Sequence, residues 1–301
     1  MNILITGAWG QAKEHLSYIQ SLGHGVVFQQ QEAEPLTCPG EWVEGIICNG
    51  LFLHHGLEEF PNLRYLQLTS AGLDRIPLKA MQKRGIEIRN AKGVFSIPMA
   101  EHALWGVLTL YRQGVAFLHQ QAEGNWEKRR GLKELFGSTV CIIGTGNVGI
   151  ECASRFRAFG CRVIGVNRTV REVAAFDKVY PMTQLDEALA CVDVVVLTIA
   201  LTEETRGLMN TERFAKMKPG SVLVNIARGA LVDDAALIDA LQNQLSGAVL
   251  DVFDPEPLSP ESPLWAMENV IVTPHNSFVG DGAALRLNAL ILKNLKECAH
   301  E

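Results

Sequence analysis

The sequence has no excess of positive charge. Its 301 residues include 27 Lys and Arg against 33 Asp and Glu, which gives a formal net charge of −6. Proteins that bind nucleic acid or an anionic membrane surface usually carry a basic patch or stripe, and no run of Lys or Arg stands out here. We therefore expect neither a nucleic acid nor a membrane as a partner.

Long apolar runs are also lacking. Stretches such as residues 192–200 fall far short of the ~20 apolar residues that span a bilayer. Residues 1–6 lack the basic region, apolar run and cleavage site of a secretory signal, and they are predicted to begin a strand instead.

The cysteines show no pattern of a metal or redox site. There are seven, an odd number, and no two of them form a C-x-x-C pair. Several lie within apolar runs, where a thiol behaves as a small hydrophobic side chain. Buried structural thiols in a reducing, cytoplasmic compartment are expected, with no bound metal.

The order of the apolar segments indicates an α/β protein. Short β-rich apolar runs alternate with amphipathic helical stretches in two successive regions, a pattern typical of parallel sheets with helices on both faces. We therefore predict two Rossmann-like, doubly wound parallel-sheet domains with a cleft between them. The first region has predicted strands at residues 2–6, 25–29, 45–48, 65–68 and 86–89. The second has them at 139–143, 162–166, 192–198, 221–226, 247–250 and 270–272.

Two long helical stretches flank the second region. Residues 97–121 are apolar and nearly free of glycine, with Pro98 in the first turn, where a missing N–H is tolerated. They are predicted to form one helix, part of which packs against a second subunit of a homodimer. Residues 282–298 are predicted to form a final helix that returns to the first domain.

A glycine-rich turn follows the strand at 139–143. It reads Gly144-Thr145-Gly146-Asn147-Val148-Gly149 and leads directly into a predicted helix, the context that makes this motif a dinucleotide site. Gly144 allows the tight turn, Gly146 lets the backbone approach a pyrophosphate, and Gly149 permits close packing of helix on strand. The helix N-terminus offers N–H groups to the phosphates.

The end of the next strand should contact the adenosine ribose. An acidic residue there would repel a 2′-phosphate, but the sequence reads Asn167-Arg168-Thr169 with no acid before Glu172. Arg168 can bind phosphate, and Asn167 and Thr169 can donate to its oxygens. NADP is therefore the predicted cofactor. An exposed loop arginine in an enzyme that accepts NAD is the alternative.

Three polar segments follow later strands. They are Asn225-Ile226-Ala227-Arg228-Gly229, Asp251-Val252-Phe253-Asp254-Pro255-Glu256-Pro257 and Thr273-Pro274-His275-Asn276. Because each follows an apolar strand, all three should meet at the carboxyl edge of the sheet, where open α/β folds bind ligands. A plain network of ion pairs is the alternative to a catalytic group.

These segments resemble those of the D-isomer-specific 2-hydroxyacid dehydrogenases, the family of phosphoglycerate dehydrogenase and the glyoxylate/hydroxypyruvate reductases. The resemblance runs from about Asn62 to about Leu290 and keeps the family's order and approximate spacing. Further matching segments are Ser70-Ala71-Gly72-Leu73-Asp74, Met99-Ala100-Glu101-His102, Thr202-Glu203-Glu204-Thr205 and Pro263-Leu264-Trp265. One departure is Ala200, where the family usually has proline.

The resemblance implies a role for each catalytic residue in the reduction of a 2-oxo acid to a D-2-hydroxy acid. Arg228 would bind the substrate carboxylate and polarise the oxo group, a task suited to its planar fork of donors. His275 would donate the proton as general acid. Glu256 would orient the imidazole and favour its protonated form.

The resemblance also implies further binding residues. Ser70, Ala71 and Gly72 would form a second anchor for the carboxylate, and Asp251 would lie near the nicotinamide carboxamide. Other positions that match the cofactor site are Ile199, Ala200, Thr205 and Ala227. By this reading, residues 1–96 and 277–301 form a substrate-binding domain and residues 97–276 form the dinucleotide-binding domain.

Two other functions fit the same motifs. Corepressors of the C-terminal-binding-protein type keep the catalytic residues and use the dinucleotide as a structural or sensing ligand, although no recognition segment is visible here. A phosphoglycerate-type dehydrogenase would need extra cations near the substrate, and no basic cluster appears in the loops of the first domain, although Arg75 and Lys92 are available. Formate dehydrogenase pairs its histidine with glutamine, so Glu256 argues against it.

The identity of the 2-oxo acid is less determined. The family's loop after the third strand lies beside the substrate, and here it contains Leu51 and Phe52. An apolar loop favours medium-sized apolar or aromatic substrates, because each buried methylene contributes about 0.8 kcal/mol. Alternatively, Leu51 and Phe52 pack into the core of their own domain.

Overall fold

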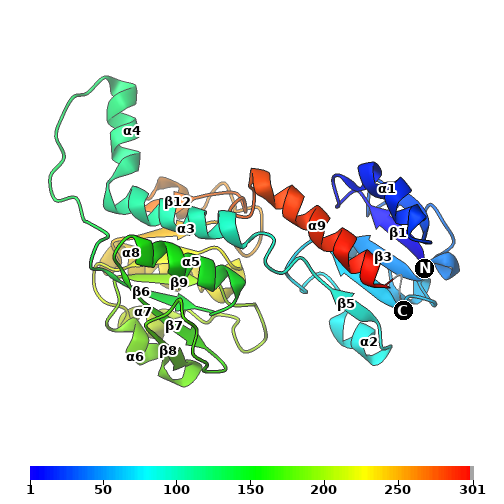
Figure 1. The fold of residues 1–301 in the computed structure, drawn as a ribbon. Coiled ribbons are helices and arrows are strands. Elements are labelled where there is room, and N and C mark those ends of the chain that lie inside the picture. The colour runs from blue at the N-terminus through cyan, green and yellow to red at the C-terminus, as the bar shows by residue number, and fades with distance from the viewer. Residues whose placement is uncertain (299–301) are drawn as a thin grey trace. The chain divides into compact units, whose positions relative to one another are not determined.

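The computed structural model describes residues 1–298 and divides into two compact units. Unit 1 comprises Met1–Phe95 and the segment that starts at Gly280, and unit 2 comprises Ser96–Val279 (Figure 1). Each unit is built around one parallel sheet, which confirms the predicted fold class. Residues 299–301, the end of the expected substrate domain, lie outside the described part of the chain.

Unit 1 contains a five-stranded sheet in the order β2-β1-β3-β4-β5. The strands are β1 (Asn2–Thr6), β2 (Gly25–Gln29), β3 (Gly45–Cys48), β4 (Tyr65–Leu68) and β5 (Glu87–Arg89). Successive side chains of β1 point to opposite faces. Ile3 and Ile5 pack in one core and Leu4 in the other.

Helices cover both faces of this sheet. The helices α1 (Ala12–Ser21) and α9 (Asp281–Cys298) belong to the core around Ile3, to which α9 contributes Leu287, Ile291 and Leu295. Helix α2 (Leu78–Lys83) covers the opposite face through Met81. The apolar face of α9 explains why the final helix returns to the first part of the chain.

Unit 2 contains a seven-stranded parallel sheet in the order β12-β11-β10-β9-β6-β7-β8. The strands are β6 (Thr139–Ile143), β7 (Arg162–Asn167), β8 (Lys178–Pro181), β9 (Val194–Leu197), β10 (Val222–Asn225), β11 (Gly247–Leu250) and β12 (Val270–Val272). The chain leaves β6 toward β7 on one side and later returns to β9 on the other. The pair β6 and β9 is thus the point where strand order reverses, the position at which such sheets bind ligands.

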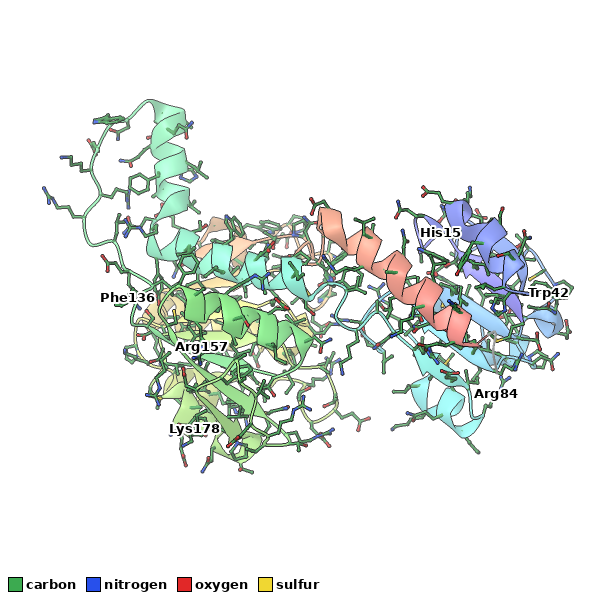
Figure 2. All side chains as sticks on the ribbon, viewed as in Figure 1. His15, Trp42, Arg84, Phe136, Arg157 and Lys178 are labelled. Carbon is green, nitrogen blue, oxygen red and sulfur yellow. The ribbon has the colours of Figure 1, made fainter. Side chains whose placement is uncertain are left out.

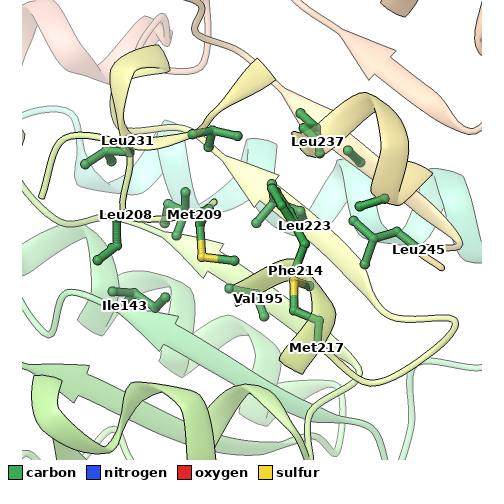
Figure 3. Close-up of a cluster of buried hydrophobic side chains, with 14 of the residues drawn as sticks. Ile143, Val195, Leu208, Met209, Phe214, Met217, Leu223, Leu231, Leu237 and Leu245 are labelled. Carbon is green, nitrogen blue, oxygen red and sulfur yellow. The ribbon is translucent and has the colours of Figure 1, made fainter. Parts of the chain in front are cut away.

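Two apolar cores lie on the two faces of this sheet. One contains α3 (Ser96–Tyr111) and α5 (Asn147–Ala158), which lie side by side in Figure 1. The other contains α6 (Leu185–Leu189), α7 (Thr211–Lys216) and α8 (Asp234–Asn243), and Figure 3 shows some of its buried side chains. Strands β9 and β10 are buried on both sides, which accounts for their unbroken apolar sequences.

The prediction of one helix over residues 97–121 is wrong. The chain breaks after α3 and starts a second helix, α4 (Gly114–Glu123). Between them Gln113 takes a left-handed conformation with φ 52°, which no α-helix can contain. Seven residues of helix α3 are buried, whereas none of the residues of α4 is. Helix α4 also projects away from the sheet of its unit (Figure 1).

Strand β8 was not predicted from the sequence. It is a half-polar edge strand that ends in Pro181, and only its β7 side is paired. Asp177 holds its start, because its carboxylate accepts the Val163 N–H at 2.7 Å and an Arg157 N–H at 2.8 Å. Figure 2 labels Arg157 on α5.

Within the described residues, no helix has the length and apolar character needed to cross a membrane. No group of His, Cys, Asp and Glu suited to a metal ion occurs among them either. Four of the seven cysteines are buried, whereas Cys191 is exposed. None of the seven forms a disulfide.

Candidate active site

Strand register brings the three polar segments to one edge of the unit 2 sheet. Asn225, the last residue of β10, pairs with Leu250 of β11, and Leu250 pairs with Val272 of β12. On its other side Asn225 pairs with Leu197 of β9, whose neighbour is Ile143 of β6. The glycine turn and the three polar segments therefore all leave the carboxyl ends of neighbouring strands.

The glycine turn is tightly packed against β9. Gly144 has φ 108°, and a side chain there would lie 2.7 Å from the Ile199 nitrogen. A side chain at Gly149 would lie 2.0 Å from the Gly144 carbonyl oxygen, so only glycine lets α5 approach the strand this closely. The turn is fixed further by Thr198, whose hydroxyl donates to the Gly144 carbonyl at 2.7 Å.

The start of α5 fits a bound pyrophosphate. Gly146 is its N-cap, no side chain caps the helix there, and Asn147 and Val148 form its first turn. A side chain built on Gly146 meets nothing within 4 Å, so the turn has open space beside Gly146. Unpaired N–H groups at a helix N-terminus attract phosphate through their own dipoles and that of the helix.

The end of β7 carries the loop expected at the adenosine ribose. The Asn167 amide donates to the hydroxyl of buried Thr145 at 2.8 Å, and its carbonyl oxygen accepts the Arg168 N–H at 3.0 Å. Arg168 is exposed, with its guanidinium 3.9 Å from Glu204. Asn167 thus ties the ribose loop to the glycine turn, and exposed Thr169 follows Arg168.

The loop after β9 is stabilised by its threonines. The Thr205 hydroxyl donates to the Ala200 carbonyl at 2.9 Å and accepts the Thr202 N–H at 2.7 Å. These bonds hold the turn in the absence of the proline usual at position 200. Ile199 packs against the core at the start of the same loop.

Arg228 lies in a turn held by Asn225. The Asn225 side chain donates to the Arg228 carbonyl at 2.9 Å and accepts the Ala227 N–H at 3.1 Å. The next residue, Gly229, lies so close to the Phe253 backbone that a side chain would come within 2.0 Å of it. This contact places the Arg228 turn directly beside the loop that carries Glu256.

Glu256 and His275 form a hydrogen-bonded pair. His275 Nδ1 lies 2.8 Å from Glu256 Oε2, and the other carboxylate oxygen accepts the Phe253 N–H at 3.1 Å. The His275 side chain is 31% exposed. Among the residues that the structure describes, none bonds to Nε2, so this nitrogen can exchange a proton with a ligand. A carboxylate on one ring nitrogen with the other open suits acid–base chemistry.

Asp251 is fully buried behind this pair. Its carboxylate accepts hydrogen bonds from the Thr273 hydroxyl at 2.5 Å and from the N–H groups of Asn276 and Ser277 at 2.8 and 2.9 Å. The Thr273 oxygen also lies 3.1 Å from His102 Nε2. No role was predicted for Thr273 or His102, although both lie within segments that resemble those of the family.

The remaining site residues belong to unit 1. Ser70, Ala71 and Gly72 follow β4, where the Ser70 hydroxyl donates to the Gly72 carbonyl and the Asn90 amide to the Ala71 carbonyl. The structure shows this turn but no ligand contact, so its role as a carboxylate anchor stays a prediction.

Leu51 and Phe52 lie in a short 3-10 helix (Leu51–Leu53) after β3. Leu51 is fully buried in the core, and Phe52 packs edge-on against Phe60 with ring centroids 5.9 Å apart. This burial favours the alternative in which both residues pack into their own domain. The exposed apolar side chain of the loop is Leu53, at 61%.

Comparison with known proteins identifies the family. Residues 104–277 match the model of the D-isomer specific 2-hydroxyacid dehydrogenase, NAD binding domain. The chain belongs to the D-isomer-specific 2-hydroxyacid dehydrogenases. The family inferred from the motifs is therefore confirmed.

One member of the family is similar to this chain over most of the chain's length. A D-3-phosphoglycerate dehydrogenase from Archaeoglobus fulgidus is 35% identical over 240 residues, 79% of this chain and 46% of that protein. The chain therefore spans about half the length of that relative.

Solved structures of the family share the fold. A glyoxylate reductase from Paecilomyes thermophila superimposes with a TM-score of 0.89 at 27% identity and covers 100% of this chain and 96% of that one. A family member from Xanthobacter autotrophicus Py2, in complex with NADPH and MES, has a TM-score of 0.77 at 29% identity and covers 98% and 93%.

Proposed function

We propose that this dehydrogenase reduces a 2-oxo acid to the D-2-hydroxy acid, with Arg228, Glu256 and His275 as its catalytic group. The observation that carries the proposal is the 2.8 Å contact between His275 and Glu256 at the sheet edge that also holds the glycine turn. The bound nicotinamide supplies the hydride. His275 Nε2 donates the proton to the substrate oxygen, since Nδ1 is held by Glu256.

The charges of the catalytic group suit this step. The Glu256 carboxylate stabilises the positive imidazole before the proton leaves and fixes the orientation of the ring. Arg228 presents a planar cation that can hold a carboxylate with two parallel hydrogen bonds and draw electron density from the neighbouring oxo group. Asn225 and the close contact at Gly229 position the backbone of Arg228 for this task.

NADPH is the preferred cofactor in this proposal. Arg168 is exposed at the end of β7, and no acidic residue precedes it on this loop to repel a 2′-phosphate. The exposed pair with Glu204, at 3.9 Å, is worth little and is easily exchanged for a phosphate. The NADPH-bound relative shows that the family includes members that hold this cofactor.

A homodimer that uses α4 completes the proposal. Helix α4 buries no residue in its own chain, and it exposes Phe117 and Leu118 at 40% and 64%, while Trp126 in the following loop is 97% exposed. Apolar side chains gathered on one projecting element are typical of a protein interface. A second copy of the chain would cover them. The absence of disulfides among the described cysteines fits a reducing compartment such as the cytoplasm.

A substrate screen tests the proposed reaction. NADPH oxidation is followed with glyoxylate, hydroxypyruvate, pyruvate, phenylpyruvate and 2-oxoisocaproate. Turnover of at least one of them above 1 s⁻¹, within the roughly 1–1000 s⁻¹ common for enzymes, supports the proposal. No oxidation with any of them, although the dinucleotide binds, would favour the sensing function of a corepressor instead.

A further inference from the structure

The backbone at His275 is held in an unusual conformation. His275 has φ 51°, in the left-handed region that side chains other than glycine rarely adopt. Such a conformation persists only where surrounding contacts impose it. The contacts responsible for it therefore also set the direction of the imidazole.

Asp251 supplies these contacts. Three successive N–H groups donate to it: that of His275 to its backbone carbonyl at 2.8 Å, and those of Asn276 and Ser277 to its carboxylate at 2.8 and 2.9 Å. Asp251 is fully buried, so water does not weaken these bonds. The left-handed turn is thus wrapped around one buried anion.

The position of that anion depends on Thr273. Its hydroxyl lies 2.5 Å from Asp251 Oδ1 and has a single hydrogen, which it donates to the carboxylate. The same oxygen can then only accept from His102 Nε2, 3.1 Å away on α3. The proton of the His102 ring is therefore on Nε2.

His102 is suited to a fixed, neutral role. Burial lowers its pKa below the ordinary histidine value, and the negative charge of Asp251 opposes that shift only in part. The ring packs against Trp105, with centroids 5.1 Å apart. A neutral imidazole in a single tautomer, held by a neighbouring ring, can direct one hydrogen bond without changing its charge near neutral pH.

We propose that His102 is a positioning residue for the reaction, which acts through Thr273 and Asp251 on the turn that carries His275. The chain of contacts is continuous within unit 2: His102 Nε2 to Thr273 Oγ1, Thr273 Oγ1 to Asp251 Oδ1, and Asp251 to the N–H groups of residues 275–277. The inference rests on the proposed role of His275 as proton donor. Asp251 is accordingly a structural anchor of the catalytic turn, whatever it contacts in the cofactor.

Variants of Thr273 separate positioning from folding. Thr273→Val keeps the shape and removes the hydroxyl, and Thr273→Ser restores it. A displacement of about 1 Å in a reacting group can lower a rate about 100-fold. We expect Thr273→Val to lower kcat by about 10- to 100-fold with the NADPH dissociation constant unchanged within twofold, and Thr273→Ser to recover most of the loss. Thr139→Val, at the amino end of β6, is the control for replacing a threonine at the end of a strand of the same sheet.

Variants of His102 test the first link. His102→Leu removes the donor, whereas His102→Gln keeps an N–H at similar reach. We expect His102→Leu to lower kcat as Thr273→Val does, and the double variant to be no slower than the slower single variant, because both break one chain of contacts. A kcat within twofold of the unmodified enzyme for Thr273→Val and His102→Leu, or a loss confined to the melting temperature, would overturn the inference.

The His275→Ala background separates this inference from the proposed function. If the His275→Ala enzyme retains a near-normal rate, His275 is not the proton donor and the proposed function is contradicted. If His275→Ala is slow, adding Thr273→Val should cost nothing more, since the turn then positions no acid. A further tenfold loss in that background would leave the role of His275 intact and contradict the positioning chain.

Discussion

Nδ1 of His275 lies 2.8 Å from Oε2 of Glu256, and the two side chains are about one-third exposed. The pair joins the loop after β11 to the loop after β12. A buried structural ion pair would show neither this exposure nor a second ring nitrogen open to a ligand. We therefore expect replacement of Glu256 to affect catalysis more than the stability of the fold.

Replacement of Glu256 by Gln should change the pH dependence of the reaction more than its stability. The amide can still orient the ring, but it no longer favours the positive imidazole that donates the proton. Reduction should therefore slow at high pH first, and the optimum pH should move to lower values. Steady-state rates from pH 5 to pH 9 test this, with exposed Glu268→Gln as the control. An unchanged profile would remove Glu256 from the mechanism.

The cofactor loop predicts a preference for NADPH that depends on Arg168. A charge-assisted contact to the 2′-phosphate contributes roughly 1.5–3 kcal/mol to the binding of NADPH. Arg168→Ala should therefore lower the ratio of kcat/KM with NADPH to kcat/KM with NADH about 10- to 100-fold. Arg162→Ala, at the opposite end of β7, should leave the ratio unchanged. A preference for NADH in the unmodified enzyme would contradict the proposal that Arg168 binds the 2′-phosphate of NADPH.

Asn167→Asp should move the preference further toward NADH. The Asn167 amide donates to the Thr145 hydroxyl, and an aspartate can instead accept from that hydroxyl, so the link between the ribose loop and the glycine turn is kept with its direction reversed. The new negative charge repels a 2′-phosphate and can accept from ribose hydroxyls. Dissociation constants for NADH and NADPH, measured by fluorescence, test this. Equal weakening of both would indicate damage to the turn instead of altered selectivity.

If the exposed apolar side chains of α4 form a dimer interface, one charge introduced among them should disrupt the dimer. Leu118→Glu should place a carboxylate in the interface and give a monomer by light scattering at micromolar concentrations, where the unmodified chain is a dimer. Leu285→Glu, at a similarly exposed leucine on α9, should not alter the mass. A monomeric unmodified chain would contradict the role of α4.

Asp193 predicts a pH-dependent contribution to the stability of unit 2. Burial alone would raise its pKa, but the hydrogen bonds from Lys218 and the Thr139 N–H, with the charge of Lys133, hold it below the ordinary value. A carboxyl group whose pKa is lower in the folded than in the unfolded state stabilises the fold at any pH above its unfolded-state pKa. This stabilisation is lost as the pH falls through the folded-state pKa. Asp193→Asn should therefore cost about 1–3 kcal/mol of unfolding free energy at pH 7 and progressively less below pH 4. An equal cost at pH 7 and pH 3 would contradict this.

The sequence predicted the strands that hold the site better than it predicted the periphery. Runs such as residues 222–226 are apolar at nearly every position, because strands covered on both faces must be, and this locates their carboxyl ends within a residue or two. Since parallel strands align their carboxyl ends, the order of the polar segments was enough to predict one shared edge. The break at Gln113 was missed because its neighbours are apolar, although Gly114 was a signal for it.

The network behind His275 could not be predicted from the sequence. His102 and Thr273 are 171 positions apart, and no local pattern links a helix residue to a strand end at that separation. Burial also favours a core role for Leu51, which the sequence alone left open between a substrate pocket and a core. Its full burial depends on the packing of β3 and β4, which no short window of sequence contains.

The rate of 2-oxo acid reduction by His275→Ala measures whether His275 is the proton donor. With NADPH saturating and the best substrate of the screen, kcat should be lower by about two to four orders of magnitude, the usual contribution of a positioned general acid. The melting temperature and the NADPH dissociation constant should stay close to those of the unmodified enzyme. A kcat within a few fold of the unmodified enzyme would contradict the role of His275 as proton donor.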